Sequence, residues 1–334
     1  MSKIKPAKGS PYARILGVGG YRPVRVVPNE VILETIDSSD EWIRSRSGIA
    51  TRHWASPQET VSAMSVEASG KALADAGIAP EQIGAVIVST VSHFKQTPAV
   101  ATEIAHRIGA GKPAAFDISA GCAGFGYGLT LAKGMVVEGS AEYVLVIGVE
   151  RLSDLTDLED RATAFLFGDG AGAVVVGPSD EPAIGPTVWG SEGDKSETIK
   201  QTVPWDEYRT TDSGEKFPAI TQEGQAVFRW AVFEMAKVAQ QALDAAGITP
   251  EDLDVFIPHQ ANMRIIDSMV KTLKLPDHVT VARDVETTGN TSAASIPLAM
   301  ERLLATGAAK SGDTALVIGF GAGLVYAATV VTLP

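Results

Sequence analysis

One segment of this chain occurs twice, and the repetition constrains the fold more than any other feature of the sequence. Residues 73–88 read LADAGIAPEQIGAVIV, and residues 243–258, which start 170 positions later, read LDAAGITPEDLDVFIP. A second pair agrees, because the Leu-Val-Ile-Gly of residues 145–148 returns 171 positions later at residues 316–319. Chance can produce one such match, but two matches at nearly equal spacing indicate a duplicated chain.

Each copy has the pattern of a helix, a turn and a buried strand. Helical spacing of alanine and leucine gives way to Gly and Pro, and then to a run of apolar residues. Chains that alternate helices and strands form layered α/β folds with mostly parallel sheets. We therefore expect an α/β protein of two related halves, residues 1–178 and 185–334, joined by a proline-rich stretch that begins at Pro178.

Composition and charge exclude several classes of protein. The 334 residues are 45% hydrophobic and 20% charged, which is typical of a globular protein with a large core. A net charge of −12 argues against nucleic acid as a partner. The N-terminus lacks the apolar core of a signal peptide, and no run approaches the roughly 18 apolar residues of a membrane span. A single cysteine excludes a disulfide framework and predicts a reducing, cytoplasmic location.

The single cysteine, Cys122, lies where a predicted strand turns into a predicted helix. An apolar segment ends at Ile118, and apolar residues recur at helical spacing from Phe125 onward. The unpaired N–H groups at a helix start carry partial positive charge, so we expect them to favour the nucleophilic thiolate of Cys122 over the thiol. The alternative is an inert, buried cysteine. Close packing against this helix is also predicted, because it contains four glycines that each cost roughly 1 kcal/mol relative to alanine: Gly124, Gly126, Gly128 and Gly134.

The second half offers polar residues at equivalent places. Ser292 lies 170 positions after Cys122, in the turn that contains Asn290, so a pseudo-two-fold axis could bring the two turns face to face. His259 follows the strand of the second copy, at the strand end where α/β sheets usually place their sites. A lone histidine there is more often structural. Three polar groups at three strand ends or turns, however, indicate an active site.

Four motifs then resemble one enzyme family. They are Ala-Gly-Cys-Ala-Gly-Phe, Pro-His-Gln-Ala-Asn, Gly-Asn-Thr-Ser-Ala-Ala-Ser and Gly-Phe-Gly-Ala-Gly, at residues 120–125, 258–262, 289–295 and 319–323. Together they resemble the β-ketoacyl-acyl-carrier-protein synthase III family, which initiates bacterial fatty-acid synthesis, over essentially the whole chain. The resemblance implies a thiolase-like fold, with the two halves packed as an α/β/α/β/α sandwich, and a homodimer. Elongating synthases use a second histidine where Asn290 stands, and thiolases use a second cysteine.

The resemblance implies a two-step reaction without a metal or redox cofactor. Cys122 attacks an acyl-CoA thioester, and the backbone N–H groups of Cys122 and Ala322 hold the oxyanion. Malonyl-acyl-carrier protein then enters, and His259 and Asn290 donate hydrogen bonds to its thioester carbonyl as CO2 departs. The resulting carbanion attacks the acyl-cysteine.

The same resemblance assigns binding residues for both substrates. Trp42 and Arg161 sandwich the CoA adenine, Arg46 meets its phosphates, and Gly224 and Asn262 line the pantetheine tunnel. In many family members a phenylalanine carried by the dimer partner closes the acyl pocket. Here the corresponding stretch contains Thr97, which leaves more room and weakens the expectation of strict acetyl-CoA specificity.

A basic helix face predicts where an acidic carrier protein docks. In the helix after His259, the apolar residues Ile265, Ile266, Met269, Val270 and Leu273 share one face and should pack inward. The opposite face carries Arg264, Lys271 and Lys274, and we expect Arg229 to extend this patch. Ordinary solvation is the alternative for such a face.

Other functions compatible with these residues are kept open. A relative of the same fold can prime a polyketide or transfer acyl groups without decarboxylation. A Cys-His-Asn hydrolase resembling the papain group has the same order of residues, but its Cys-Gly-Ser-Cys-Trp motif and disulfides do not occur here. A catalytically silent scaffold that binds carrier protein is disfavoured by the intact triad.

Overall fold

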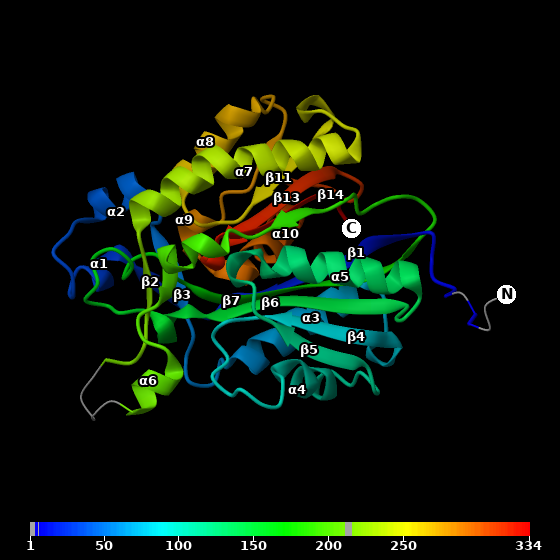
Figure 1. Ribbon diagram of the computed structural model, residues 1–334, viewed down its shortest axis with the longest axis horizontal. Coiled ribbons are helices and arrows are strands. Elements are labelled where there is room, and N and C mark those ends of the chain that lie inside the picture. The colour runs from blue at the N-terminus through cyan, green and yellow to red at the C-terminus, as the bar shows by residue number, and fades with distance from the viewer. Residues whose placement is uncertain (1–3, 6, 211–215) are drawn as a thin grey trace.

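The computed structural model describes residues 4–5, 7–210 and 216–334. Its centre consists of two five-stranded sheets (Figure 1). In spatial order, the strands of the first sheet are β1 (Tyr12–Tyr21), β7 (Asp169–Ser179), β6 (Tyr143–Arg151), β4 (Ile83–Ser89) and β5 (Ala114–Ile118). Those of the second sheet are β12 (Thr280–Val281), β11 (Val255–Pro258), β13 (Thr314–Gly321), β14 (Val325–Thr332) and β8 (Val188–Gly190).

The two sheets have the same pairing pattern, as the duplication predicts. Strand β4 is parallel to β5 and β6, and its counterpart β11 is parallel to β12 and β13. One strand of each sheet is reversed, because β7 is antiparallel to both β6 and β1, and β14 is antiparallel to both β13 and β8. The other four strands of each sheet share one direction, so the sheets are mostly parallel as predicted, with the reversed strand following β6 or β13 in the chain.

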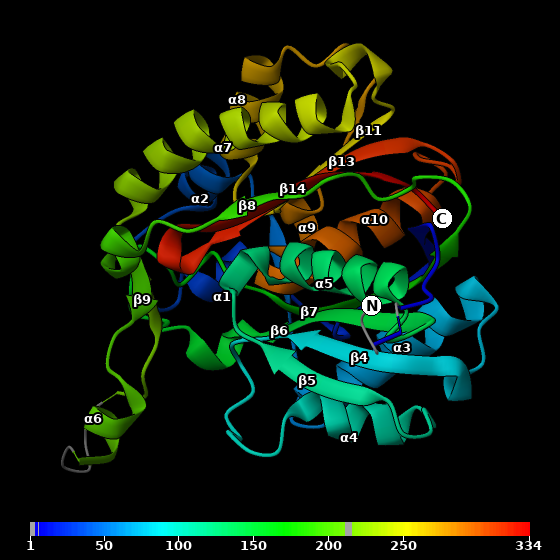
Figure 2. The same ribbon diagram turned by 45° about the vertical axis from the view of Figure 1, so that its right-hand side comes forward.

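Helices form three layers around the sheets, which confirms the predicted α/β/α/β/α sandwich. Helices α5 (Gly124–Glu138) and α10 (Ser295–Ala305) lie between the two sheets (Figures 1 and 2). The outer layer of the first sheet is α3 (Val61–Ala76) and α4 (Val100–Arg107). That of the second is α7 (Gly224–Ala246) and α8 (Met263–Leu273).

The central helices contribute large apolar side chains to the core. Phe125 and Leu129 of α5 and Ile296 and Met300 of α10 are at most 1% exposed and pack between the sheets. Burying a large apolar side chain contributes about 1.5–3 kcal/mol. This packing therefore stabilises the two helices that begin directly after Cys122 and the Asn290 turn.

The repeated sequence produces the same helix ending in both halves. Helices α3 and α7 end at Gly77 and Gly247, whose φ angles of 65° and 73° are left-handed and favour glycine. A 3₁₀ turn beginning with proline follows in each half, η1 (Pro80–Gln82) and η5 (Pro250–Asp252). The shared Gly and Pro of the two copies thus have one structural cause.

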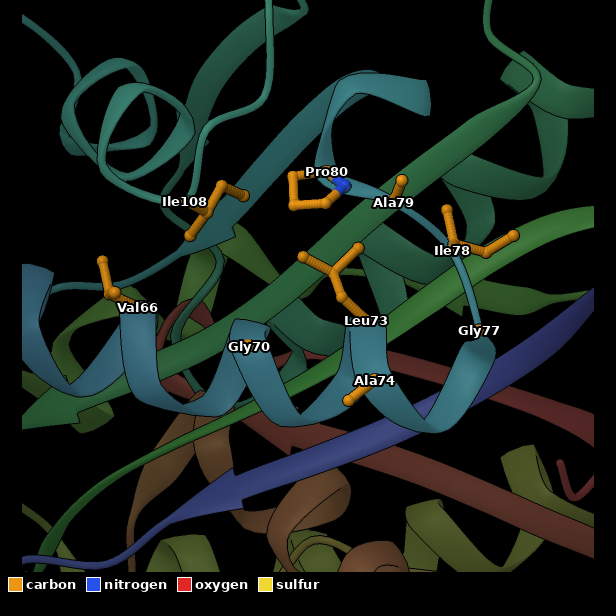
Figure 3. Close-up of a pocket in the computed structure, with 9 residues that line it drawn as sticks. All are labelled: Val66, Gly70, Leu73, Ala74, Gly77, Ile78, Ala79, Pro80 and Ile108. Carbon is orange, nitrogen blue, oxygen red and sulfur yellow. The ribbon is translucent and has the colours of Figure 1, made fainter.

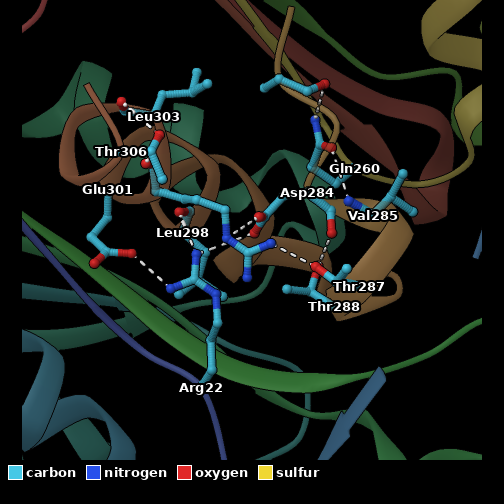
Figure 4. A network of polar contacts seen from close by, with 12 residues as sticks. Arg22, Gln260, Asp284, Val285, Thr287, Thr288, Leu298, Glu301, Leu303 and Thr306 are labelled. Carbon is cyan, nitrogen blue, oxygen red and sulfur yellow. Dashed lines mark hydrogen bonds and ion pairs between the residues drawn. The ribbon is translucent and has the colours of Figure 1, made fainter. Parts of the chain in front are cut away.

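A polar network joins the end of β1 to the second half (Figure 4). Arg22 forms ion pairs with Glu301 at 2.7 Å and with Asp284 at 3.2 Å, and it donates to the Leu298 carbonyl at 2.8 Å. Asp284 also pairs with Arg302 at 2.7 Å. Because Asp284 precedes the helix that leads to Asn290, this network fixes the turn against the first half.

Shorter elements complete the described chain. They are β2 (Arg25–Pro28), α1 (Asn29–Ile32), α2 (Asp40–Ser47), β3 (Thr51–Trp54), η2 (Gly121–Ala123), η3 (Leu152–Leu155), η4 (Gly193–Thr198), β9 (Ile199–Gln201), α6 (Trp205–Thr210), β10 (Ile220–Gln222), α9 (Val285–Thr288), η6 (Ser292–Ala294) and η7 (Ala322–Leu324). Helix α6 extends away from the sandwich (Figure 1). No helix in the described ranges combines the length and the apolar character needed to cross a membrane.

Candidate active site

A cavity of about 1070 Å³ brings together the three residues that the sequence predicts at separate strand ends and turns. Cys122, His259 and Asn290 all line it. A smaller hollow of about 450 Å³ lies beside α3 and is lined by apolar residues and glycines between Val66 and Ile108 (Figure 3). The smaller hollow offers no nucleophile, acid or base, so the larger cavity is the candidate active site.

Cys122 lies in η2, between the end of β5 and the start of α5, as predicted. Glycines of β13 allow the second half to approach it. A Cβ atom at Gly321 would lie 2.9 Å from the Cys122 Sγ, and one at Gly319 would lie 2.9 Å from the Cys122 carbonyl oxygen. Any larger residue at these two positions would displace the nucleophile.

The predicted close packing against α5 holds for most of its glycines. A Cβ at Gly124 would meet the Ser89 side chain, and one at Gly126 would lie 2.8 Å from Ala327 of the second sheet. Gly128 packs as closely, at 2.8 Å, against Val146. Only Gly134 has nothing within 4 Å, so the prediction fails there.

The predicted thiolate of Cys122 is corrected by the structure. The pKa of the Cys122 thiol is raised to about 12, chiefly by burial, while Ser292 acts to lower it and the negative charge of Glu150 acts to raise it. The sequence shows the helix start but not the apolar surroundings of the thiol. A helix dipole contributes at most about 2 kcal/mol, which this burial exceeds. The resting nucleophile is therefore a thiol.

His259 is a neutral imidazole whose orientation is fixed by one hydroxyl. The residue is 2% exposed, and burial lowers its pKa to about 3. Its Nδ1 lies 2.7 Å from the Ser295 Oγ, which accepts a hydrogen bond from the Gln260 N–H at 3.4 Å. The hydroxyl oxygen can accept this bond and still donate its proton to Nδ1, and in that tautomer the imidazole carries its proton on Nε2.

Asn290 presents its amide as a donor. Its Oδ1 accepts a hydrogen bond from the Ser292 N–H at 2.8 Å, which leaves the Nδ2 protons for the cavity. The backbone is fixed on both sides, because the Asn290 N–H donates to the Leu166 carbonyl at 2.8 Å and its carbonyl accepts from the Gly168 N–H at 3.0 Å. Asn290 and His259 can therefore both donate to one ligand atom.

Ala322 lies beside the cysteine turn. It begins η7 and lines the cavity. A Cβ at Gly121, the residue before Cys122, would lie 3.4 Å from the Ala322 nitrogen. The backbone nitrogens of Cys122 and Ala322 thus lie in adjacent turns.

Trp42 and two arginines form a separate cluster at α2. The Arg161 guanidinium lies 4.7 Å from the centroid of the Trp42 ring, and that of Arg46 lies 5.9 Å from it. Phe165 supports the ring edge-on at 5.5 Å. An aromatic base can enter between Trp42 and Arg161 only if the arginine moves outward, because the two already stack.

The two predicted tunnel residues lie at helix starts. Asn262 caps α8 by accepting from the Arg264 N–H at 2.9 Å, and it donates to the Arg46 carbonyl at 3.0 Å. It therefore links α8 to the Trp42 helix. Gly224 is the first residue of α7, and a side chain there would meet nothing within 4 Å. Neither residue lines the cavity that contains Cys122, although the nearby Gln222 and Ala261 do.

Thr97 does not line the cavity of its own chain. It is exposed, whereas its neighbours Gln96 and Ala99 do line the cavity. Nearby, three exposed aromatic residues pack together with ring centroids 5.3–5.4 Å apart: Phe94, Trp205 and Phe217. They also line the cavity, so an apolar cluster that the sequence analysis missed forms part of its wall.

The basic face of α8 has the predicted orientation. Ile265, Ile266, Met269 and Leu273 are buried and Val270 is half-buried, whereas Arg264, Lys271 and Lys274 are exposed. Arg264 stacks on the Phe228 ring at 4.8 Å, and the nearby Asp267 is paired with Arg283 at 2.7 Å. Within the described residues, no ion pair neutralises Arg264, Lys271, Lys274 or the exposed Arg229.

The sequence analysis also missed Glu150. This residue is the next to last of strand β6, is 0% exposed and acts electrostatically on Cys122. A sequence signal existed, since a charged residue directly follows a buried strand at its carboxyl end.

Comparisons with known proteins agree with this geometry. A sequence model of 3-oxoacyl-[acyl-carrier-protein] synthase III matches residues 116–193. A second model, which describes the C-terminal part of the same family, matches residues 243–333. Curated relatives with full coverage of both chains are the β-ketoacyl-[acyl-carrier-protein] synthase III 1 of Streptomyces coelicolor, 87% identical, and the synthase III of Streptomyces glaucescens, 88% identical.

Solved structures show the same fold. The priming β-ketosynthase of the R1128 polyketide pathway is 47% identical, with a TM-score of 0.97 and coverage of 100% of this chain and 99% of that one. The synthase III of Aquifex aeolicus is 37% identical, with a TM-score of 0.87 and coverage of 96% and 99%. With these identities over its whole length, the chain belongs to the 3-oxoacyl-[acyl-carrier-protein] synthase III family of condensing acyltransferases.

Proposed function

We propose that this chain condenses a short-chain acyl-CoA with malonyl-acyl-carrier protein, releases CO2 and CoA, and forms β-ketoacyl-acyl-carrier protein as the first step of fatty-acid synthesis. The observation that carries the proposal is the convergence of a thiol, a neutral imidazole and a carboxamide on one cavity. The names of three relatives that are 83–88% identical support the same reaction.

In the first half-reaction, Cys122 takes the acyl group. Its sulfur attacks the thioester carbon, and the negative oxygen that forms accepts hydrogen bonds from the N–H groups of Cys122 and Ala322. The bond to the CoA sulfur then breaks and CoA leaves. The adjacency of η2 and η7 supports this role for the two N–H groups.

In the second half-reaction, His259 and Asn290 act on the malonyl thioester. The Nε2–H of His259 and an Nδ2 proton of Asn290 donate to its carbonyl oxygen, where negative charge develops as CO2 departs. These donors favour the transition state over the bound substrate, since the enolate charge exists only along the reaction path. A neutral imidazole suits this role, because it donates without first having to gain a proton.

The CoA nucleotide binds at the Trp42 cluster. Its adenine lies between Trp42 and Arg161, and Arg46 pairs with the phosphates. Asn262 and Gly224 border the pantetheine chain that leads to Cys122. The stacking of both arginines on Trp42 and the open space at Gly224 support this path.

The malonyl carrier docks on the basic face formed by Arg229, Arg264, Lys271 and Lys274. Carrier proteins of this pathway are acidic, and a chain of net charge −12 repels them except where positive charge is concentrated. The absence of ion pairs on these four side chains among the described residues supports the assignment.

The active form is a cytoplasmic homodimer of chains with two halves, residues 1–178 and 185–334. In it, Thr97 of each protomer reaches the acyl pocket of its partner. Two observations support an interface at this surface. Thr97 is exposed beside a cavity, and the nearby aromatic residues Phe94, Trp205 and Phe217 are exposed as well. Exposed apolar patches of this kind mark interfaces. The two sheets have the same pattern of strand pairing, which supports the division of the chain into two halves, although β7 extends one residue beyond the first boundary.

A second candidate function is the priming of a polyketide. The specific observation in its favour is the TM-score of 0.97 with a priming β-ketosynthase. Both functions use the same half-reactions and differ in the starter and in the carrier protein that receives it.

The test is the mass of the product. The chain is incubated with malonyl-carrier protein and, in separate reactions, with acetyl-CoA, isobutyryl-CoA and longer acyl-CoAs, with Cys122→Ala as the control. We expect a β-ketoacyl-carrier product with one CO2 released per product, and the control should form no such product. Transfer of the acyl group without CO2 release would contradict the proposal. Condensation only with a polyketide carrier protein would favour the second candidate.

A further inference from the structure

We propose that Arg52 is a positioning residue that sets both the CoA nucleotide site and the Asn290 turn through one backbone segment, residues 165–168. The inference rests on the proposed function, in which the Trp42 cluster binds CoA and Asn290 acts on the malonyl thioester. Arg52 lies on β3 and does not line the cavity. Its guanidinium instead donates to the Phe165 carbonyl at 2.8 Å, at the start of the shared segment.

Arg52 is a buried cation held by neutral oxygens. Its side chain is 0% exposed, and no ion pair reaches it within the described ranges. Besides the Phe165 carbonyl, the guanidinium donates to the Asn29 Oδ1 at 2.7 Å and to the Val27 carbonyl at 3.2 Å. Burial lowers the pKa of Arg52 to about 10, so it is still charged at neutral pH. A buried charge without a partner charge is costly. The rigid fork of donors, which joins acceptors from three segments, is the property that an apolar residue could not supply.

The segment that accepts from Arg52 also holds the Asn290 turn. The Asn290 N–H donates to the Leu166 carbonyl at 2.8 Å, and the Asn290 carbonyl accepts from the Gly168 N–H at 3.0 Å. The turn also packs directly on the arginine, because a Cβ at Gly289 would lie 2.9 Å from the Arg52 Cβ. A change in the position of Arg52 therefore displaces the backbone that carries the Asn290 amide.

Two further contacts connect Arg52 to Trp42. The Phe165 ring, whose carbonyl accepts from Arg52, packs edge-on against the Trp42 ring with centroids 5.5 Å apart. The second contact runs through Asn29, which accepts from Arg52 and donates to the Asp40 carboxylate at 2.7 Å. Asp40 is the first residue of α2, the helix that carries Trp42. Arg52 thus holds Trp42 through the ring that supports it and through the start of its helix.

This arrangement makes both half-reactions depend on one residue outside the cavity. The Trp42 cluster binds CoA in the first half-reaction, and Asn290 donates to the malonyl carbonyl in the second. A displaced segment 165–168 should weaken both together. The reactivity of Cys122 should not change, because its turn packs on Gly319 and Gly321 of β13.

The test replaces Arg52 by methionine and by lysine. Methionine keeps an unbranched apolar stem without donors, whereas lysine keeps the charge without the fork. Lys133→Met is the matched control, because Lys133 is a half-buried cation that donates to the Gly185 carbonyl at 2.8 Å. The readouts are the dissociation constant of CoA, the rate of condensation by pre-acylated enzyme, and the rate of alkylation of Cys122 by iodoacetamide. Thermal unfolding of each variant identifies a folding defect.

Arg52→Met should weaken CoA binding and slow condensation, each by about 10-fold to 10²-fold, because small displacements of positioned groups have effects of this size. Arg52→Lys should show smaller losses in the same two readouts, since its single ammonium group cannot join all three acceptors. Alkylation should stay at the wild-type rate in both variants. The control should match the wild type in every readout.

Double variants separate positioning from general damage. If Arg52 acts through Asn290, adding Arg52→Met to Asn290→Ala should cause no further loss of condensation. Likewise, adding Arg52→Met to Trp42→Ala should cause no further loss of CoA binding. Losses that add in either pair would overturn the inference, as would a parallel fall in alkylation or folded Arg52 variants that behave like the wild type. Arg52→Lys, the milder change, replaces Arg52→Met in these pairs if methionine prevents folding.

The binding measurement does not require turnover. A wild type that binds CoA but forms no condensation product would contradict the proposed function. Weaker CoA binding by Arg52→Met, without an additive effect on Trp42→Ala, would still support the role of Arg52.

Discussion

Cys122 and Ser292 line one cavity, and each residue lies in the 3₁₀ turn before one of the two central helices. This placement is a direct consequence of the duplicated architecture. Because α5 and α10 pack side by side between the sheets, their N-terminal turns meet at one point. The nucleophile of one half is therefore served by polar groups of the other.

The two half-reactions should separate by mutation. In His259→Ala and Asn290→Ala, Cys122 should still be acylated by acetyl-CoA, because the removed donors face the malonyl carbonyl. Condensation should fall by about 10²–10³-fold for each, the usual loss for one oxyanion donor. Single-turnover measurements of both steps check this. If acylation collapses while condensation by pre-acylated enzyme persists, the two roles have been assigned to the wrong step.

His259 should make the folded protein sensitive to acid. Its folded pKa, about 3, lies below the ordinary value of 6.5, so below pH 6.5 the unfolded chain binds more protons than the folded one. Its contribution to stability is thus present above pH 6.5 and is lost as the pH falls toward 3. Relative to the wild type, His259→Gln should gain up to about 1.4 kcal/mol in the free energy of unfolding per pH unit of acidification. Urea unfolding at a series of pH values measures the difference, and a pH-independent difference would mean that His259 titrates normally.

The high pKa of Cys122 shows what sequence reasoning could not reach. The repeated Gly and Pro after α3 and α7 were predictable, because φ and turn chemistry are local properties. The position of Cys122 at a helix start was predictable for the same reason. The desolvation of its sulfur was not predictable, since the residues around the half-buried Cys122 come from segments as distant as Gly321. The helix start alone predicted the wrong direction of the pKa shift.

The distinction between local patterns and long-range packing also explains which of the other sequence-based predictions were correct. Glu150 and Ser292 are 142 positions apart in the sequence, and only the packing of α5, α10 and β6 makes them neighbours. The strand direction after β6 was missed, because an apolar run has the same pattern in a parallel and in an antiparallel pair. The inward face of α8 was correct, because its period of apolar residues is local.

Thr97→Phe should reduce the acyl pocket of the partner protomer. We expect the ratio of kcat/KM values to shift from branched starters toward acetyl-CoA. The shift should be modest, since one methylene in an apolar pocket is worth about 1–3 kcal/mol. Competition between isobutyryl-CoA and acetyl-CoA measures it. Gln96→Ala controls for disturbance of the loop, and an unchanged ratio in Thr97→Phe would remove Thr97 from the pocket.

Charge reversal on α8 should affect only the carrier-dependent step. Arg264→Glu and Lys271→Glu should raise the KM for malonyl-carrier protein and leave acylation by acyl-CoA nearly unchanged. Added salt should weaken wild-type condensation, because exposed charges more than about 10 Å apart are largely screened at 0.1 M. Lys112→Glu, an exposed reversal in the first half, is the matched control. An equal loss for Lys112→Glu would show that net charge matters and the α8 face does not.

The most direct measurement is the intact mass of the chain after incubation with acetyl-CoA alone. Wild-type protein should gain the mass of one acetyl group, and peptide mapping should locate it on Cys122. Cys122→Ser should gain almost none, because a serine hydroxyl in this buried site has no comparable route to an anion. An acetyl group on another residue, or undiminished labelling of Cys122→Ser, would contradict the account.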